Sequence, residues 1–240
     1  MGQGWSWSGF FDYLFNPYIL SGAVTTLWLT LAAIAGGLVV GCALALARLS
    51  SRRWIAGPAH FYIWVFRGTP LLVQLIIIYT GLPQLGLKLS VIESALLGLI
   101  LNEAAYLAEI VRGGIQSIPV GQTNAARAVG FSNAQTMRYI VLPQAMRLIV
   151  PTLGNSINGL LKTTSITSVI SMEELLRRTQ VLIQEKFMVL ELFLVAALYY
   201  LLMTTAWDFV QRRIERHYGR AYGNAAAAPV VPAEPALEQR

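Results

Sequence analysis

The sequence predicts an all-α integral membrane protein whose helices cross the bilayer five times. Of its 240 residues, 55% are hydrophobic and only 12% are charged, whereas roughly 25% of the residues in a soluble domain are charged. Residues 19–47 carry no charged side chain, and this stretch exceeds the roughly 20 residues that a helix needs to cross a bilayer. The formal net charge of +6 comes from arginines at the ends of apolar runs, a pattern that indicates membrane topology and not nucleic-acid binding.

Residues 1–18 come first and are predicted to form an interfacial segment. They have neither the basic start nor the small-residue cleavage site of a secretory signal. Aromatic side chains favour the boundary between lipid and water, and this segment carries Trp5, Trp7, Phe10, Phe11 and Tyr13.

Apolar runs then predict the five spans, at residues 19–47, 56–79, 92–111, 148–170 and 188–210. If the N-terminus lies outside, eleven basic residues fall on the inner side and four on the outer side. This asymmetry follows the positive-inside rule, so we expect the N-terminus outside and the C-terminus in the cytoplasm. The inner set is Arg48, Arg52, Arg53, Arg112, Arg127, Arg138, Arg147, Arg212, Arg213, Arg216 and Arg220, and the outer set is Lys88, Arg177, Arg178 and Lys186.

A polar segment, residues 119–143, separates the third span from the fourth and is expected in the cytoplasm. Pro119 interrupts the preceding helix, and Gly130 supplies the left-handed residue that ends a first short helix. Ser132 and Gln135 have the spacing of a capping box for a second helix, which Pro143 is expected to stop. The segment is predicted to be either a docking element for another protein or an ordinary amphipathic loop.

Residues 171–186 are predicted to form an external surface helix, capped by Ser171 and Glu174. Contact with a second protein and simple cover of the bundle are equally good explanations of this helix. Residues 219–240 are rich in Ala and Pro and are predicted to form a disordered cytoplasmic tail. The residues between, 19–218, make up the predicted transmembrane domain.

Polar residues inside the predicted spans are costly in lipid, so they are expected to face a cavity or a partner. Arg67 precedes Gly68-Thr69-Pro70, which should kink the second span; Arg67 either stabilises that bend or lines a pathway. Glu103 lies near the expected midplane. A polar stripe on the fourth span consists of Asn155, Asn158, Lys162 and Ser165. Either Glu103 pairs with Lys162 while the amides join helices, or these groups line a pore.

Three stretches carry a resemblance to a known family. Asn124-Ala125-Ala126 with Gly130, Ile140, Leu142 and Pro143 resembles the EAA loop of bacterial ABC importer membrane subunits, with Asn124 in place of the usual Glu. Residues 66–75, FRGTPLLVQL, and residues 142–170 are similar to the polar amino acid permeases of the histidine, glutamine and arginine type.

The resemblance implies a type I ABC importer permease bundle in the inner membrane of a bacterial cell. It implies docking on an ABC ATPase through Gln122, Asn124, Ala125, Ala126 and Gly130. The further partners it implies are a second permease subunit, identical or related, and a periplasmic solute-binding protein that residues 171–186 could contact. The ammonium group of an amino acid substrate would contact Glu103. The carboxylate of the same substrate would contact Lys162 and backbone groups near Thr163 and Ser165.

Catalytic chemistry is not expected in this chain. None of its three lysines follows the glycine pattern of a phosphate-binding loop, so we expect no bound cofactor here, and ATP and magnesium in a partner ATPase. One cysteine and two histidines, without clustered carboxylates, predict no metal site and no nucleophile pair. The rival functions are an ATP-independent secondary transporter and a membrane scaffold without transport.

Overall fold

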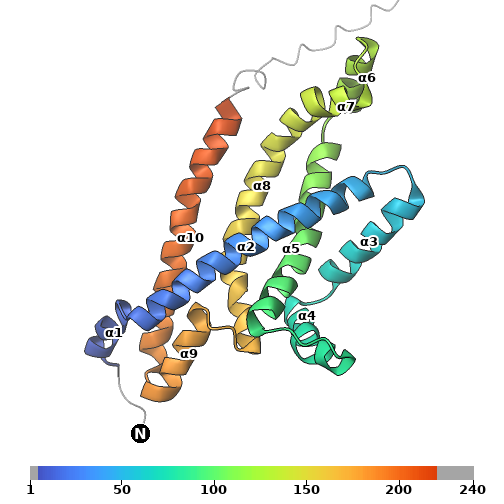
Figure 1. Cartoon of the computed structure of the whole chain (residues 1–240). Coiled ribbons are helices and arrows are strands. Elements are labelled where there is room, and N and C mark those ends of the chain that lie inside the picture. Colours follow the sequence, from blue (N-terminus) through green and yellow to red (C-terminus); the bar gives the residue numbers. More distant parts are fainter. Residues whose placement is uncertain (1–4, 221–240) are drawn as a thin grey trace, which may run out of the picture.

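The computed structural model describes residues 5–220, which are folded as helices with no strand among them (Figure 1). The α-helices are α1 (Trp7–Leu14), α2 (Pro17–Arg48), α3 (Arg53–Gly68), α4 (Leu71–Ile76), α5 (Val91–Gln116), α6 (Val120–Ala128), α7 (Asn133–Gln135), α8 (Leu142–Thr163), α9 (Leu175–Lys186) and α10 (Val189–Arg220). Two π-helical segments, η1 (Ile77–Gly81) and η3 (Thr136–Val141), and two 3₁₀ segments, η2 (Leu82–Leu85) and η4 (Thr164–Ile170), join them.

Helices α2 and α5 pack along each other at the centre of the bundle, and α8 lies between α5 and α10. The backbones of α2 and α5 approach closely because Gly41 has no side chain: a Cβ there would lie 3.0 Å from the carbonyl oxygen of Ala104. Leu29, Leu99 and Leu107 are fully buried in the main core. Figure 1 shows α6 and α7 at the same end of the bundle as the C-terminal part of α10, with α1 and α9 at the opposite end.

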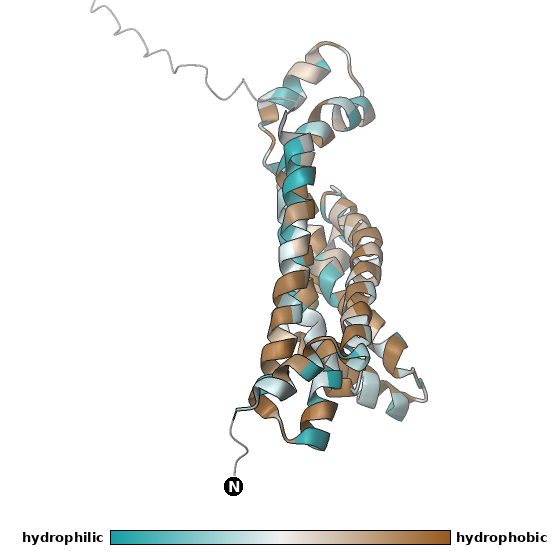
Figure 2. Cartoon of the chain, turned by 90° about the vertical axis from the view of Figure 1, so that its left-hand side faces the viewer, coloured by the Kyte–Doolittle hydropathy of each residue, from teal (hydrophilic) through white to brown (hydrophobic). Residues whose placement is uncertain are grey.

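Three helices are long and apolar enough to cross a membrane: α2, α5 and residues Val189–Arg216 of α10. They coincide with the predicted spans at 19–47, 92–111 and 188–210. Helix α8, at the predicted fourth span, is not among them, because its polar residues lower its hydropathy. In Figure 2 the hydrophobic colour dominates the middle of the long helices, and hydrophilic residues become frequent toward the end that carries α6.

The predicted second span, residues 56–79, does not form one straight helix. Helix α3 ends at Gly68, and the segment Leu71–Leu85 leaves it at an angle of 103°. The predicted kink at Gly68-Thr69-Pro70 is confirmed, because Thr69 and Pro70 are extended and Pro70 is the N-cap of α4. If the bent pair counts as one span, the number of possible crossings rises to four.

The helix, elbow and helix of residues 119–143 are present with one correction. Gly130 is left-handed with φ of 89°, and Ser132 and Gln135 form the predicted capping box. Pro143 does not stop the second helix, because Leu142 is helical and the chain continues through η3 into α8. The wider π turn of η3 accommodates a proline that lacks a backbone donor.

Helix α9 begins later than predicted. Ser171 has φ of 64° and does not cap it; Glu174 is the N-cap, and its carboxylate accepts a 2.8 Å hydrogen bond from the backbone N–H of Arg177. The predicted capping box of Ser171 with Glu174 is therefore wrong, since η4 extends to Ile170 and the chain turns at Ser171. The predicted tail falls almost entirely at 221–240, outside the described residues.

Candidate functional site

The bend between α3 and α4 is held open by amide side chains. Nε2 of Gln74 donates to the carbonyl oxygens of Phe66 and Thr69, at 3.0 and 3.1 Å, and to Oγ1 of Thr69 at 2.8 Å. Nδ2 of Asn102 donates to Oε1 of Gln74 at 3.1 Å and to the carbonyl of Phe66 at 3.3 Å. These bonds satisfy carbonyls that the break in the helix exposes. The sequence reasoning assigned this task to Arg67 and missed Gln74 and Asn102, although Gln74 lies four residues after the proline in an apolar run.

A cavity of about 370 Å³ lies against this bend, between α5 and α8. Glu103, whose side chain is 7% exposed, contributes its carboxylate, and Oγ of Ser156 on α8 donates a hydrogen bond to it. We call this space the Glu103 cavity; its lining comprises Thr69, Pro70, Leu71, Asn102, Glu103, Tyr106, Ser156, Gly159, Leu160 and Thr163. Besides the buried carboxylate, the lining offers one amide and four hydroxyl groups beside apolar side chains, a combination that suits a small polar ligand with a cationic group.

Lys162 does not share this cavity. It lines a separate space with Ser165 and with Tyr200, Leu201 and Thr204 of α10, and no described residue forms a salt bridge with it. Because Ser156, Gly159 and Thr163 occupy the face of α8 toward Glu103, Lys162 lies on another face. The structure therefore supports neither a Glu103–Lys162 pair nor a single intrachain site that contains both.

The two asparagines of the predicted stripe also face α10. Nδ2 of Asn158 donates to Oδ1 of Asp208 at 2.5 Å, and Oδ1 of Asn155 accepts from Nε2 of Gln211 at 3.3 Å. The predicted stripe thus exists, and its amides join two helices. Asp208 and Gln211 were not singled out from the sequence because they lie near the polar end of the last apolar run.

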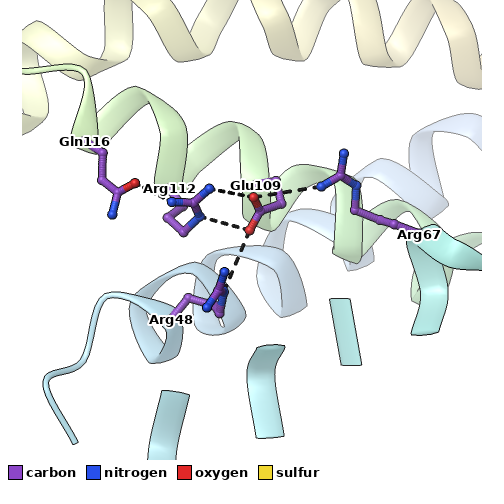
Figure 3. Close-up of polar contacts among 5 residues, drawn as sticks. All are labelled: Arg48, Arg67, Glu109, Arg112 and Gln116. Atoms are coloured by element: carbon purple, nitrogen blue, oxygen red, sulfur yellow. Dashed lines mark hydrogen bonds and ion pairs between the residues drawn. The ribbon is translucent and has the colours of Figure 1, made fainter. Parts of the chain in front are cut away.

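Arg67 lies on the other side of Tyr106 from the Glu103 cavity. Its guanidinium is 5.3 Å from the centre of the Tyr106 ring, and its Nη1 is 3.9 Å from Oε2 of Glu109. Figure 3 shows Glu109 among Arg48, Arg67 and Arg112, which we call the Glu109 cluster. The carboxylate beside Arg67 is therefore that of Glu109, a residue that the sequence did not single out.

The predicted docking residues are mostly exposed at the tip formed by α6 and its elbow. Gln122, Asn124, Ala125 and Gly130 are exposed, whereas Ala126 is only 5% exposed and packs inward. Two apolar side chains at the tip, Val120 and Val129, are 72% and 75% exposed. Exposed apolar groups next to polar ones are typical of a surface that binds another protein.

Comparisons with known proteins agree with this architecture. Residues 37–220 match the family described as binding-protein-dependent transport system inner membrane component. The chain is 38% identical to the arginine transport system permease protein ArgU of Corynebacterium glutamicum, with 90% of this chain and 73% of ArgU covered. It is 39% identical to the glutamine transport system permease protein GlnP of Escherichia coli, with 83% of this chain and 92% of GlnP covered.

Solved structures show the same fold. The chain superimposes on a crystal structure of an amino acid ABC transporter with histidines, with a TM-score of 0.84 and 37% identity, covering 90% of this chain and all of the other. The inward-facing MetNI methionine ABC transporter matches with a TM-score of 0.70 over 84% of this chain and 96% of the other, and at 19% identity this likeness concerns the fold alone. The chain belongs to the family of inner membrane components of binding-protein-dependent transport systems.

Proposed function

We propose that this chain is the membrane subunit through which an ATP-driven importer moves a polar amino acid into a bacterial cell. The observation that carries the proposal is the 38–39% identity to arginine and glutamine permeases over most of the chain. The Glu103 cavity between α5 and α8 adds a space of suitable size and polarity. Pocket volumes of about 300–1,000 Å³ are usual for small-molecule sites.

The energy for transport would come from a separate ATPase subunit. The exposed tip of α6 offers Gln122, Asn124, Ala125 and the Gly130 elbow, together with Val120 and Val129, as a surface for this partner. ATP and magnesium would bind to the partner, and this chain would have no ATPase site of its own. When two ATPase subunits close on ATP, each would push on the elbow, and the helices would rock between inward-facing and outward-facing arrangements.

The topology we propose has five crossings: α2, the α3–α4 pair, α5, α8 and α10. The eleven-to-four distribution of basic residues supports a cytoplasmic position for the end with α6 and the C-terminal part of α10. Residues 1–18 would lie at the outer interface of the inner membrane, residues 19–218 would form the permease domain, and 219–240 would be a cytoplasmic tail. Helix α9 would face the periplasm, where a solute-binding protein delivers the substrate, and a second permease copy or relative would complete the pathway.

For the substrate we assign the ammonium or another cationic group to Glu103. The same cavity offers polar groups from Thr163, Asn102 and Ser156. The ring of Tyr106 separates the cavity from the guanidinium group of Arg67. The lining of the Glu103 cavity does not include Lys162, Ser165, Asn155 or Asn158, which face α10.

Co-purification from cells tests the proposal. A tagged copy of the full chain should bring down an ABC ATPase, whose activity rises when a solute-binding protein loaded with its amino acid is added. A secondary transporter would catalyse uptake without any ATPase, and a scaffold would show no substrate stimulation. Either result would contradict the proposed function.

A further inference from the structure

The Glu109 cluster has more positive than negative charge. Arg112 alone holds the carboxylate by hydrogen bonds, from Nε to Oε1 at 2.9 Å and from Nη2 to Oε2 at 2.7 Å (Figure 3). Arg48 and Arg67 approach the same carboxylate only to 3.9 Å. The single carboxylate of Glu109 therefore lies near three guanidinium groups, of which those of Arg48 and Arg67 form no hydrogen bond with it.

A cavity opens beside these two arginines. It has a volume of about 370 Å³, and its lining is Arg48, His60, Ile63, Trp64, Arg67, Gly68, Tyr106 and Glu109. Nε of Arg48 is buried, and within residues 5–220 it has no hydrogen-bond partner. Arg48 and Arg67 line the cavity and bring more positive charge than Glu109 offsets, so the cavity suits a ligand that brings anionic oxygen.

We expect the cluster near the cytoplasmic boundary of the hydrocarbon core, within reach of lipid headgroups. Glu109 follows Val91, the first residue of α5, by 18 positions, which is roughly 27 Å of helix, and the hydrocarbon core is about 30 Å thick. Arg48 is the last residue of α2. Trp54, the second residue of α3, is 72% exposed, as expected for a tryptophan at a membrane boundary.

From these observations we propose that the cavity beside Arg48 and Arg67 binds the phosphate of an anionic phospholipid from the cytoplasmic leaflet. The two guanidinium groups hold the phosphate oxygens by charge-assisted hydrogen bonds. The exposed ring of Trp64 and the side chain of Ile63 border the cavity and contact the apolar part of the lipid. A basic pocket between membrane helices on the cytoplasmic side has the chemistry that recognises such headgroups. The proposal concerns a site separate from the Glu103 cavity and does not depend on which amino acid is transported.

Native mass spectrometry of the purified full chain, titrated with phosphatidylglycerol or phosphatidylcholine, tests the site. Phosphatidylglycerol should bind at least tenfold more tightly. The double variant Arg48→Gln/Arg67→Gln should lose this preference, and Arg48→Lys/Arg67→Lys should keep most of it. The matched control Arg52→Gln/Arg53→Gln removes two arginines at the start of α3, outside the cavity, and should bind like the unsubstituted chain.

Equal binding of the two lipids, or an unchanged preference in the glutamine double variant, would overturn the proposal. An equal loss in the control would also overturn it, because attraction would then be a property of the whole basic surface. Displacement of the lipid by millimolar inorganic phosphate or by free amino acid would assign the cavity to a soluble anion instead. If the double variant fails to fold, thermal unfolding of the unsubstituted chain decides: phosphatidylglycerol must raise the midpoint more than phosphatidylcholine does.

Discussion

Glu103 on α5 and Ser156 on α8 are hydrogen-bonded inside the bundle, with Oγ of Ser156 donating to Oε1 of Glu103. The bond fixes the carboxylate on the face of α8 that borders the α3–α4 bend. A buried carboxylate is costly unless it is paired, and a hydroxyl partner leaves its negative charge available to a cationic ligand. This relationship makes the Glu103 cavity the part of the bundle best suited to an amino acid's ammonium group.

Replacing Glu103 with Gln should lower amino acid uptake at least tenfold and leave the thermal unfolding midpoint within a few degrees of the original. The amide oxygen can still accept from Ser156, so the packing is retained while the charge is lost. Uptake by the complete transporter in vesicles, together with unfolding in detergent, measures both effects. Glu93→Gln, at the exposed N-terminal end of α5, is the matched control. Normal uptake by Glu103→Gln would remove the carboxylate from the substrate path.

Replacing Gln74 with Leu should destabilise the bundle by about 2–3 kcal/mol. The change deletes bonds to Phe66 and Thr69 and one from Asn102, and a typical bond contributes about 1 kcal/mol, or more when a buried partner is left unpaired. Denaturant unfolding in detergent measures the loss. Gln84→Leu, whose side chain is exposed, should change stability by less than about 0.5 kcal/mol. Equal effects of the two substitutions would show that Gln74 does not hold the bend.

The stability of the chain should depend on pH through Glu174. Burial raises the pKa of this carboxyl, and hydrogen bonds from the backbone at Leu176 and Arg177 and from Tyr200 and Thr26 offset part of the rise. The folded chain therefore holds the proton more tightly than the unfolded chain. The tighter proton binding stabilises the folded chain fully at pH values below about 4.3, the pKa of a free glutamate. This stabilisation is lost as the pH rises through the raised pKa of the folded chain.

Thermal unfolding between pH 4 and pH 8 measures this dependence. In Glu174→Gln the fall in the midpoint with rising pH should be smaller than in the unsubstituted chain, because the side chain no longer ionises. Glu173→Gln is the control, since the neighbouring Glu173 is largely exposed, with a 3.5 Å ion pair to Arg178. Parallel profiles for the unsubstituted chain and Glu174→Gln would contradict the assignment.

Replacing Gly130 with Leu should reduce co-purification of the ATPase and leave the bundle folded. The left-handed backbone at φ of 89° strains any side chain that branches from it, by about 1–2 kcal/mol, and a Cβ at Gly130 would meet no described atom within 4 Å. The substitution therefore strains the backbone of the elbow and does not disturb the packing of the bundle. Gly130→Asn should retain the ATPase better, because asparagine adopts this conformation more readily. An ATPase yield that Gly130→Leu leaves unchanged would remove the elbow from the docking surface.

The all-helical membrane architecture, the kink at Pro70 and the elbow at Gly130 were predictable because each depends on local chemistry. Long apolar runs identify α2, α5 and α10, and proline and glycine act on their own backbone. The continuation through Pro143 was not predictable, because a π turn depends on how the neighbouring segments pack. The cap of α9 was misplaced for a similar reason: two glutamates follow Ser171, and only the folded chain shows which of the candidate residues caps the helix.

The site was predicted less well than the fold. Glu103 was identified correctly as an interior carboxylate because a charge inside an apolar run is conspicuous. Its partner was not identified, because helical spacing defines the faces of α8 without saying which face meets α5 and which meets α10. Asn102 and Glu109 were missed for the same reason, because Asn102 bonds to Phe66 and Gln74, and Glu109 pairs with Arg48 and Arg67, across segments far apart in the sequence.

The measurement that tests the central claim most directly is amino acid uptake into vesicles that contain this chain, its ATPase and its solute-binding protein. The proposed function predicts uptake that requires ATP hydrolysis and the loaded binding protein, and that stops when the ATPase is catalytically inactive. Uptake that continues without ATP, or a complete complex that hydrolyses ATP and moves no amino acid, would contradict it.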